Sequence, residues 1–454
     1  MANPFTMGVA SGEPLPDGVI LWTRLAVDPL HPDPARPGGM PPRAMPVRWQ
    51  LAEDEAFTRI VREGTAQALP AWAHSVHVRV DGLRPGADYF YRFRSGTDLS
   101  PVGRTRTADE ETATRAVRFA VANCQRYEHG YYTACRHLAD ERPDVVFQVG
   151  DYIYESRQAG SYVRRTDQAG AASTLHAYRN RYARYKTDPD LRAAHAAAPW
   201  VTTWDDHEVL DNYRGAGDGS AAFLRRRAAA YQAYYEHLPI RVRPEGGGLR
   251  MYRRRTWGRV ADFMVLDARQ HRTATTLLGA EQESWLMTRL RDTPVRWRIL
   301  MQPLFFGRRF VPGPPPNLRT DSWDGHQVER DRVVAAAGPA GLVVFSGDVH
   351  NAWAGDLKAD FLDPASATVG AEFVCSSISS RPPVTDSQAV LGANPHLRFF
   401  DGRRGYLSCV ASPDELRVAY RGVDYVDRRG APRVPVAEFV IPGDGVTFGN
   451  ASSK

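Results

Sequence analysis

Hydrophobic alternation marks the first hundred residues as β structure. The segment 75–80 places three valines at alternate positions between polar residues, which is the two-residue period of a strand with one buried face. Further strand candidates are the apolar or aromatic segments 18–25, 47–52 and 89–96. The spacing of Leu83, Pro85 and Tyr89 is similar to the tyrosine corner of immunoglobulin-like and fibronectin-like domains. We therefore expect a fibronectin-like β-sandwich domain over residues 4–107.

The pattern changes after the polar linker 107–115. Apolar runs of strand length show little alternation, and they occupy 116–124, 144–151, 199–206, 262–269, 296–304 and 341–350. Helical patterns follow several of them, at 129–142, 220–238 and 279–292, and further strand-like runs lie at 372–379, 406–412 and 415–423. Strands that alternate with helices and lack a polar face predict an α/β domain whose sheets are covered on both sides. We place this domain at residues 116–440.

Composition excludes several classes of protein. Of 58 basic residues only three, Lys186, Lys358 and Lys454, are lysine, and the short arginine runs lack the interleaved aromatics that stack on bases. The net charge of +6 therefore does not indicate nucleic acid as the main partner. The four cysteines show no C-x-x-C pair, which argues against a zinc ribbon or a redox motif. No apolar run is long enough for a transmembrane helix.

Metal-competent side chains stand at the ends of four predicted strands. In chain order they are Cys124; Asp151 and Tyr154; Asp205, Asp206, His207, Glu208 and Asn212; and Asp348 and His350. Ligand sites of open α/β sheets form beyond the carboxyl ends of the strands. The run 205–208 holds three carboxylates and a histidine, which repel one another unless a cation or an arginine cluster is present. These strand ends predict a metal site.

The mixture of donors narrows the choice of metal. Phenolate and carboxylate are hard anionic donors that favour a highly charged ion such as Fe(III) over zinc, and the short Cys and His spacing of structural zinc sites is absent. A neighbouring subsite of Asp and Asn oxygens suits Ca²⁺, Mg²⁺ or Mn²⁺. Such a cluster would activate a phosphoryl group as a Lewis acid and generate a metal-bound hydroxide near neutral pH.

In order along the chain, the motifs ANCQ, GDYIYE, WDDHEVLDN, LDARQHR, QPLFF and SGDVH resemble the alkaline phosphatase D (PhoD-like) family of calcineurin-like metallophosphoesterases. The opening SGEPLPDGVILWTRL resembles the N-terminal β domain of that family. The resemblance implies a four-layer αββα catalytic domain that hydrolyses phosphate monoesters, diesters or both. It also implies a ferric ion beside one or two calcium ions, with Mg²⁺, Mn²⁺ or Zn²⁺ as alternatives for the second metal.

The resemblance also implies roles for single residues. Cys124, Tyr154 and His350 would bind iron, and Asp151 would bridge iron and the second metal. Asp348 would complete the shell of the second metal.

At two positions the assignment stays open. Asp206 replaces an Asn of related enzymes, so either Asp206 or Asn212 could be the ligand of the second metal. His207 would donate a proton or contact phosphate. Arg126 and Arg157 could contact phosphate, although solvated surface arginines explain them as well.

Two further expectations come from the resemblance. Members of the family are exported, often by a twin-arginine signal, so we expect a secreted, periplasmic or cell-surface protein from which the signal has been removed. The segment 434–454 reads as a strand and a tail instead of the helix that closes the site in some members, which predicts an open cleft. The sequence does not determine the oligomeric state.

Three alternatives remain. A phospholipase D-type phosphodiesterase would act on phospholipids, with Phe305, Phe306 and Phe310 meeting an acyl chain. A surface-binding protein with a degenerate catalytic domain would lack some of the expected ligands, yet all ligand types are present. A non-haem iron oxygenase would show two His and one carboxylate, whereas this set contains Cys and Tyr.

Overall fold

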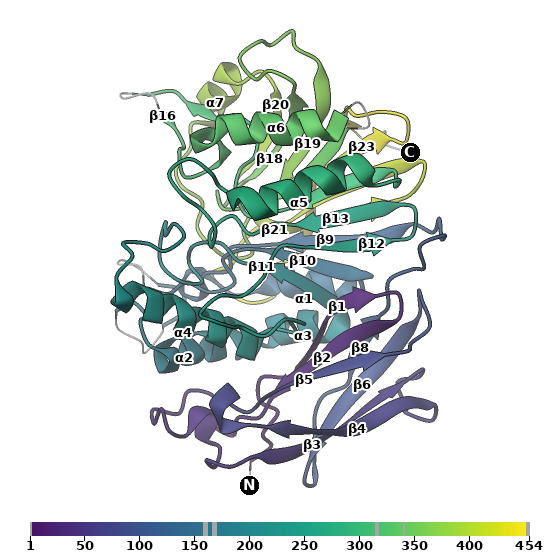
Figure 1. The fold of residues 1–454 in the computed structure, drawn as a ribbon, viewed down its shortest axis with the longest axis vertical. Coiled ribbons are helices and arrows are strands. Elements are labelled where there is room, and N and C mark those ends of the chain that lie inside the picture. Colours follow the sequence, from purple (N-terminus) through teal and green to yellow (C-terminus); the bar gives the residue numbers. More distant parts are fainter. Residues whose placement is uncertain (1, 158–161, 166–169, 314–316, 339–340, 451–454) are drawn as a thin grey trace.

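Two stacked β-sheets with helices on their outer faces form the centre of the molecule (Figure 1). The structure, a computed structural model, describes residues 2–157, 162–165, 170–313, 317–338 and 341–450. The first sheet has the strand order β24 (Gly449–Asn450), β23 (Arg433–Pro442), β22 (Glu415–Val423), β21 (Arg404–Ala411), β9 (Val117–Ala122), β10 (Val145–Val149), β11 (Pro199–Thr203), β1 (Val9–Leu15), β2 (Gly18–Arg24) and β5 (Ser75–Asp81).

The second sheet lies against the first and completes the layered core. Its order is β12 (Arg253–Trp257), β13 (Ala261–Val265), β14 (Trp297–Met301), β17 (Leu342–Ser346), β19 (Thr368–Val374), β18 (Ala352–Lys358) and β20 (Leu397–Asp401). The first sheet is covered by α1 (Thr133–Asp140), α2 (Leu175–Lys186), α3 (Pro189–Ala197) and α4 (Ala221–His237), and the second by α5 (Gly279–Asp292) and α6 (Gln327–Ala337). The predicted αββα arrangement is confirmed.

Burial on both faces explains why the central strands lack alternation. In β9, Phe119 and Val121 enter the hydrophobic cluster between the two sheets, while Ala120 and Ala122 enter the cluster under the first helix layer. Since each of these four side chains meets an apolar layer whichever way it points, all four positions are apolar. The size difference fits the two environments, because large side chains fill the space between the sheets and alanines allow close approach of helices.

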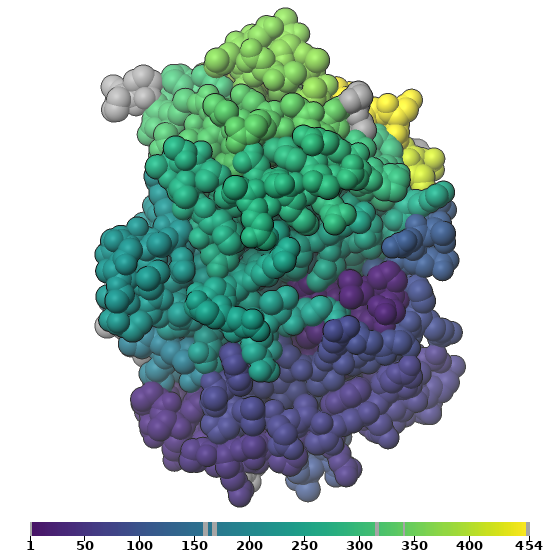
Figure 2. All heavy atoms as spheres, in the orientation of Figure 1, coloured from purple at the N-terminus to yellow at the C-terminus, as the bar shows by residue number. Residues whose placement is uncertain are grey.

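The N-terminal region is a β-sandwich that shares a sheet with the rest of the chain. A sheet of β4 (Ile60–Ala68), β3 (Met45–Ala52), β6 (Asp88–Ser95), β7 (Asp98–Leu99) and β8 (Gly103–Arg106) faces β1, β2 and β5 across a hydrophobic cluster. The tyrosine corner is present, because the hydroxyl of buried Tyr89 accepts a hydrogen bond of 3.0 Å from the backbone N–H of Arg84. β1 pairs in parallel with β11, so the regions form one continuous body, as Figure 2 shows.

Two loop regions and the C-terminal segment complete the frame around the site. The segment after β14 forms a short hairpin of β15 (Phe310–Val311) and β16 (Asn317–Leu318), and residues 314–316 lie outside the described part of the chain. Helix α7 (Ser387–Ala393) follows β19, and the chain continues through β23 and β24 as the predicted strand and tail. Among the described residues, no helix has the length and apolar character needed to cross a membrane.

Candidate metal centre

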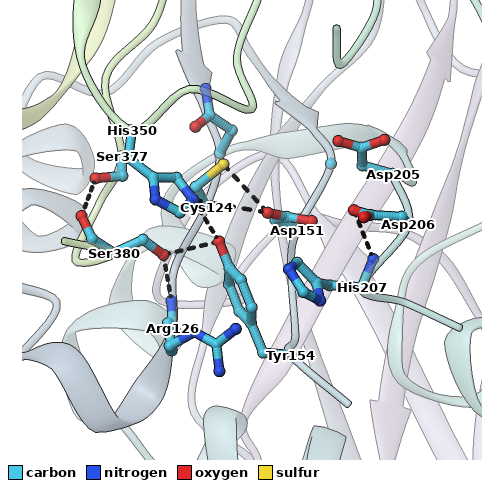
Figure 3. Close-up of polar contacts among 12 residues, drawn as sticks. Cys124, Arg126, Asp151, Tyr154, Asp205, Asp206, His207, His350, Ser377 and Ser380 are labelled. Atoms are coloured by element: carbon cyan, nitrogen blue, oxygen red, sulfur yellow. Dashed lines mark hydrogen bonds and ion pairs between the residues drawn. The ribbon is translucent and has the colours of Figure 1, made fainter. Parts of the chain in front are cut away.

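Four strands deliver the predicted ligands to one end of the stacked sheets. β9, β10 and β11 are parallel neighbours in the first sheet, and β17 belongs to the second. The segments after them carry, in the same order, Cys124; Asp151 and Tyr154; Asp206 and Asn212; and Asp348 and His350. In Figure 3, the side chains drawn from these segments gather around Asp151. The structure therefore brings together residues that lie far apart in the sequence.

Two glycines let these loops approach one another. A Cβ atom at Gly150 would lie 2.7 Å from Cβ of Asp205, and one at Gly347 would lie 2.4 Å from the side-chain amide of Asn123. Both distances are shorter than a side chain tolerates, so the loops after β10 and β17 need glycine next to their aspartates. In both Gly-Asp pairs of the sequence, therefore, the packing of the loops requires the glycine, and the aspartate is the predicted metal ligand.

The backbone at the predicted ligands is strained. Positive φ angles occur at Cys124 (50°), Asp151 (56°), Asn212 (54°), Asp348 (66°) and His350 (59°), which are five of the ten non-glycine residues with this conformation in the described chain. Such a conformation costs a non-glycine residue about 1 kcal/mol or more. The concentration of this cost in one place indicates that the fold holds these side chains in a fixed geometry.

Cys124, Asp151 and His350 form one group of possible ligands, with donor atoms within 4.8 Å of one another. Oδ2 of Asp151 lies 3.5 Å from Sγ of Cys124 and 3.9 Å from Nε2 of His350, and the Tyr154 hydroxyl lies 2.9 Å from the same Nε2. Nδ1 of His350 donates to the carbonyl of Arg381 at 2.9 Å. This bond leaves the lone pair of the other ring nitrogen free to bind a metal, as is usual for ligating histidines.

Asp151, Asp206 and His207 form a second group within the same 4.8 Å limit. Asp151 belongs to both groups, as a bridging ligand would. Asn212, by contrast, is exposed, and its side-chain amide donates to Asp211 at 3.2 Å while its backbone N–H donates to Asp206 at 2.6 Å. Asp206 therefore lies within the group, whereas Asn212 contacts it through its backbone N–H.

In the acidic run 205–208, Asp205 and Glu208 bind other parts of the chain, whereas Asp206 and His207 face the group around Asp151. Asp205 accepts a 2.5 Å hydrogen bond from Nε of the buried Arg269, and Glu208 accepts one of 2.8 Å from the backbone N–H of Asp205. These contacts relieve the repulsion expected from the sequence. Asp206 and His207 remain for the chemistry of the site.

The remaining donors need a cation. Burial, followed by the charge of Asp151, raises the pKa of Cys124 well above its usual value and does the same for Tyr154. Burial, followed by the charge of Asp206, raises the pKa of Asp348 to about 6. Oδ1 of Asp151 is buried and has no hydrogen-bond partner among the described residues. Metal ions would keep these groups deprotonated and satisfy that oxygen, so the donor set fits them.

His207 lies beside the carboxylates as a charged imidazolium. Burial lowers its pKa, but the carboxylates of Asp206 and Asp151 outweigh burial and raise the pKa to about 10. Nδ1 donates to Glu155 at 2.8 Å, and the ring lies 4.2 Å from that of Tyr154. Its Nε2 therefore holds a proton at neutral pH in the metal-free protein, which suits the predicted proton donor.

A cleft of about 960 Å³ opens onto this group of residues. Asp348 and His350 form part of its wall, with Asn212 at the edge. Its cationic lining residues are Arg126, Arg309, Arg319 and Arg381, and its apolar ones include Val311, Trp353, Val384 and Val390. An anionic group and an apolar group can both be accommodated.

The two arginines singled out from the sequence differ in position. The guanidinium of Arg126 lies 3.8 Å above the ring of Tyr154, as Figure 3 shows, and donates to the carbonyl of Ser156 at 3.0 Å. Arg157 is exposed and stacks over Tyr162 at 5.3 Å, and it does not line the cleft. Arg126 thus lines the cleft beside Tyr154, while Arg157 lies on the surface.

The expectation that Phe305 and Phe306 meet an acyl chain is wrong. Both are fully buried, Phe305 in a cluster with Trp353 and Phe306 against Trp323, because the segment after β14 runs inward before it reaches the surface. Phe310 is only half-buried, but it is also absent from the cleft lining.

Several residues that hold the predicted ligands in place were not predicted from the sequence. Ser380 donates to the Tyr154 hydroxyl at 2.9 Å and accepts from the backbone N–H of Arg126 at 3.0 Å. Glu155 holds His207, and the backbone of Arg381 orients His350. The serine-rich segment 376–380, directly after an apolar strand, is the signal that could have marked this loop.

Two stacked sheets, helices outside and a strand-end group of metal-type ligands define a metallophosphoesterase. The family model for PhoD-like phosphatases matches residues 119–420, and the model for the N-terminal domain of these phosphatases matches residues 1–109. The chain belongs to the PhoD-like phosphatase family. It is accordingly a phosphoesterase, a hydrolase.

Individual relatives agree with this assignment. The chain is 45% identical to alkaline phosphatase D of Bacillus subtilis (strain 168), over 99% of this chain and 83% of that protein. A solved structure of PhoD superposes with a TM-score of 0.94 at 43% identity, covering 100% of this chain and 93% of that one. A purple acid phosphatase from yellow lupin seeds shares the fold, with a TM-score of 0.62 at 12% identity and coverage of 96% and 74% of the two chains.

Proposed function

We propose that this chain hydrolyses phosphate monoesters, diesters or both at a cluster of one Fe(III) and one or more Ca²⁺ ions. The observation that supports it most is Asp151, whose carboxylate belongs to two groups of possible ligands at once. Cys124, Tyr154 and His350 would hold iron on one side. When bound, the metals would polarise the phosphoryl group and lower the pKa of water.

On the other side of Asp151, Asp206 and Asp348 would hold the second metal, with Asn212 orienting Asp206. The like-charge interactions between Asp206 and Asp348 support their nearness. Carboxylate oxygens suit calcium, magnesium or manganese, so the identity of this metal rests on the family resemblance.

The residues of the chain would bind the ester and move its proton. Arg126 would lie against phosphate oxygens, since its guanidinium lines the cleft above Tyr154. His207 would pass the proton on Nε2 to the leaving alkoxide, and Glu155 would keep the imidazole oriented through Nδ1. The fixed geometry of these donors is what makes such electrostatic stabilisation effective.

Elemental analysis and a visible spectrum of the purified protein test the proposal. Tyr154 and Cys124 on ferric iron should give a charge-transfer colour, and Cys124→Ser should lose the colour, the iron and the hydrolysis of aryl phosphates together. Cys135→Ser is the matched control, because Cys135 is an equally buried thiol on α1, away from the proposed ligands. A colourless, iron-free but active protein would remove the ligand assignment and leave the phosphoesterase. A fully active Cys124→Ser would return Cys124 to the core.

A second candidate, a phospholipase D-type activity, is favoured by the apolar wall of the cleft. Val311, Trp353, Val384 and Val390 could contact a hydrophobic part of a diester substrate. Choline release from phosphatidylcholine at a rate comparable with aryl diester hydrolysis would support it. Activity on aryl esters without choline release would exclude it.

We propose, too, that residues 4–107 and 116–440 are separate domains and that the protein is exported. The family models, which divide the chain between residues 109 and 119, support the boundaries. Limited proteolysis of the full chain tests them, since the first cuts are expected between residues 107 and 116 while the pairing of β1 with β11 keeps the two parts together. First cuts inside either part would contradict the boundaries. Cell fractionation of the native host tests export, and a purely cytoplasmic location would contradict it.

A further inference from the structure

The loop that follows β14 is held unusually firmly where it reaches the cleft. Three fully or nearly fully buried side chains accept hydrogen bonds from its backbone N–H groups. Glu372 binds Phe306 at 2.7 Å and Gly307 at 2.8 Å, Asp324 binds Arg309 at 2.8 Å, and Asn394 binds Phe310 at 2.9 Å. Buried carboxylates and amides that fix consecutive residues in this way indicate a loop with a positioning task.

The side chain that this loop presents to the cleft is Arg309. Its guanidinium lines the cleft together with Arg126, Asp348 and His350. Nε of Arg309 is buried, and it has no hydrogen-bond partner among the described residues. Burial lowers the pKa of Arg309, and Asp348 is the charged group that affects it most. Among the described residues, no carboxylate forms an ion pair with it.

The other buried arginines of this region are used differently. Arg269 binds Asp205 at 2.5 Å, and Arg330 binds Asp324 at 2.9 Å. Of the remaining cleft arginines, Arg319 and Arg381 are exposed. The guanidinium of Arg309 lies over the ring of Phe305 at 4.9 Å. Since no carboxylate of the described residues neutralises it, an anion would complete its surroundings.

We propose that Arg309 binds the phosphate group of the substrate directly, in the cleft that it lines together with Arg126 and Asp348. This inference rests on the proposed phosphoesterase function. The planar guanidinium matches two oxygens of a phosphate group, and its charge offsets that of the phosphate once metals neutralise Asp348. Arg309 is thus a substrate-binding residue of this site, and Glu372, Asp324 and Asn394 are its positioning residues.

Binding of inorganic phosphate to the metal-loaded protein tests the proposal without turnover. Arg309→Met should weaken phosphate binding, measured by calorimetry, by about 10- to 100-fold, which is the usual value of a charge-assisted hydrogen bond. KM for an aryl phosphate should rise in the same proportion, with a smaller change in kcat. Arg309→Lys should recover part of the affinity, because it restores the charge and not the planar fork.

Arg308→Met is the matched control, because Arg308 stands on the same loop but lines a different cavity with Asp356, Lys358 and His396. It should bind phosphate as the unchanged protein does. Metal content and thermal unfolding are measured for each variant. Unchanged phosphate affinity in Arg309→Met would overturn the proposal, and so would a loss of metal that matches the loss of affinity. If the unchanged protein binds phosphate but hydrolyses no ester, the proposed function fails while the calorimetric comparison still decides the role of Arg309.

Discussion

Asp151 and Glu13 are both buried carboxylates with positive φ angles, of 56° and 54°, yet their surroundings differ in charge. Asp151 faces other acids and acid-like donors, and one of its oxygens has no hydrogen-bond partner among the described residues. Glu13 accepts hydrogen bonds from Nε of Arg253 at 2.9 Å and from Arg255, and its backbone carbonyl accepts one from Arg241 at 3.1 Å.

The difference separates a chemical site from a structural one. At Glu13, positioned near the pairing of β1 with β11, arginines supplied by the chain neutralise the acid and tie the N-terminal region to β12. Burial raises the pKa of Asp151, but His207 and His350 outweigh burial and lower that pKa. Its neighbours lack such compensation, since burial and nearby acids raise the pKa of Cys124 and that of Asp348. Buried acidic groups whose charge the chain does not neutralise indicate a site for an external cation. A buried acid that is neutralised by arginines of the chain stabilises the fold instead.

Asp151→Asn should produce the largest effect. Because Asp151 belongs to both groups of ligands, both metals should be lost or weakened, and activity on aryl phosphates should fall by at least about 1,000-fold, the equivalent of the several kcal/mol that metal ions supply. Metal analysis and steady-state kinetics measure it. Retention of both metals at full occupancy would contradict the bridging role, even if activity fell.

The features that could be predicted depend on local pattern. The strands after residue 116 can be predicted from their apolar runs. The predicted ligands can then be placed together, because parallel strands have their carboxyl ends at one edge of the sheet. The pairing of β1 with β11 could not be predicted, since it joins Ser11 to Pro199 and no periodicity reports a contact of such sequence separation.

The site shows the same limit. Cys124, Asp151 and His350 stand at strand ends and were found, and their identity as ligands remains a prediction. Arg309 and Ser380 lie in irregular loops whose direction is set by distant buried side chains such as Glu372. Phe305 and Phe306 were misplaced for the same reason, because composition suggested an exposed aromatic loop while the path of the chain buries them.

Glu13→Gln should lower the stability of the fold by about 3 kcal/mol, because it leaves buried arginines without their anion. Metal content, and kcat measured below the unfolding temperature, should not change, since the site is separate. Urea unfolding followed by fluorescence measures the stability. A variant that unfolds normally but loses metal would show that the two acidic regions are not independent.

The two regions should also respond to pH in opposite ways. Without metal, Asp348 and Glu208 have pKa values raised to about 6 and about 8, chiefly by burial, and that of His207 is raised to about 10 by neighbouring carboxylates acting against burial. Groups that bind protons more tightly in the folded state lose stability as pH rises. The metal-free protein should therefore become less stable between about pH 4 and pH 10.

At Glu13 burial raises the pKa, but Arg253 and Arg255 outweigh it, so the pKa is lowered. Its contribution is present above the usual carboxyl pKa and is lost as the pH falls below it. Urea unfolding of the metal-free protein at pH 3, 5, 7 and 9, with and without added Ca²⁺, separates the two. Calcium should reduce the loss of stability toward high pH. The Glu13→Gln substitution should reduce only the loss of stability toward low pH. A slope at high pH that calcium leaves unchanged would assign it to another part of the molecule.

Arg241→Gln should have the smallest effect, within about 1 kcal/mol of the unchanged protein. The variant loses the 3.1 Å hydrogen bond to the carbonyl of Glu13 and the contact with Asp81 at 3.8 Å, but it also removes a cation that repels Arg255. Since Glu13 keeps its two other arginines, loss and gain nearly cancel. Removal of the acid, by contrast, leaves Arg253 and Arg255 uncompensated, whereas Arg241 keeps Asp81 at 3.8 Å. Urea unfolding of both variants under one condition measures the asymmetry. A loss of stability for Arg241→Gln as large as that for Glu13→Gln would mean that the fold needs every arginine around Glu13. The charge of Glu13 would then not be neutralised by Arg253 and Arg255 alone.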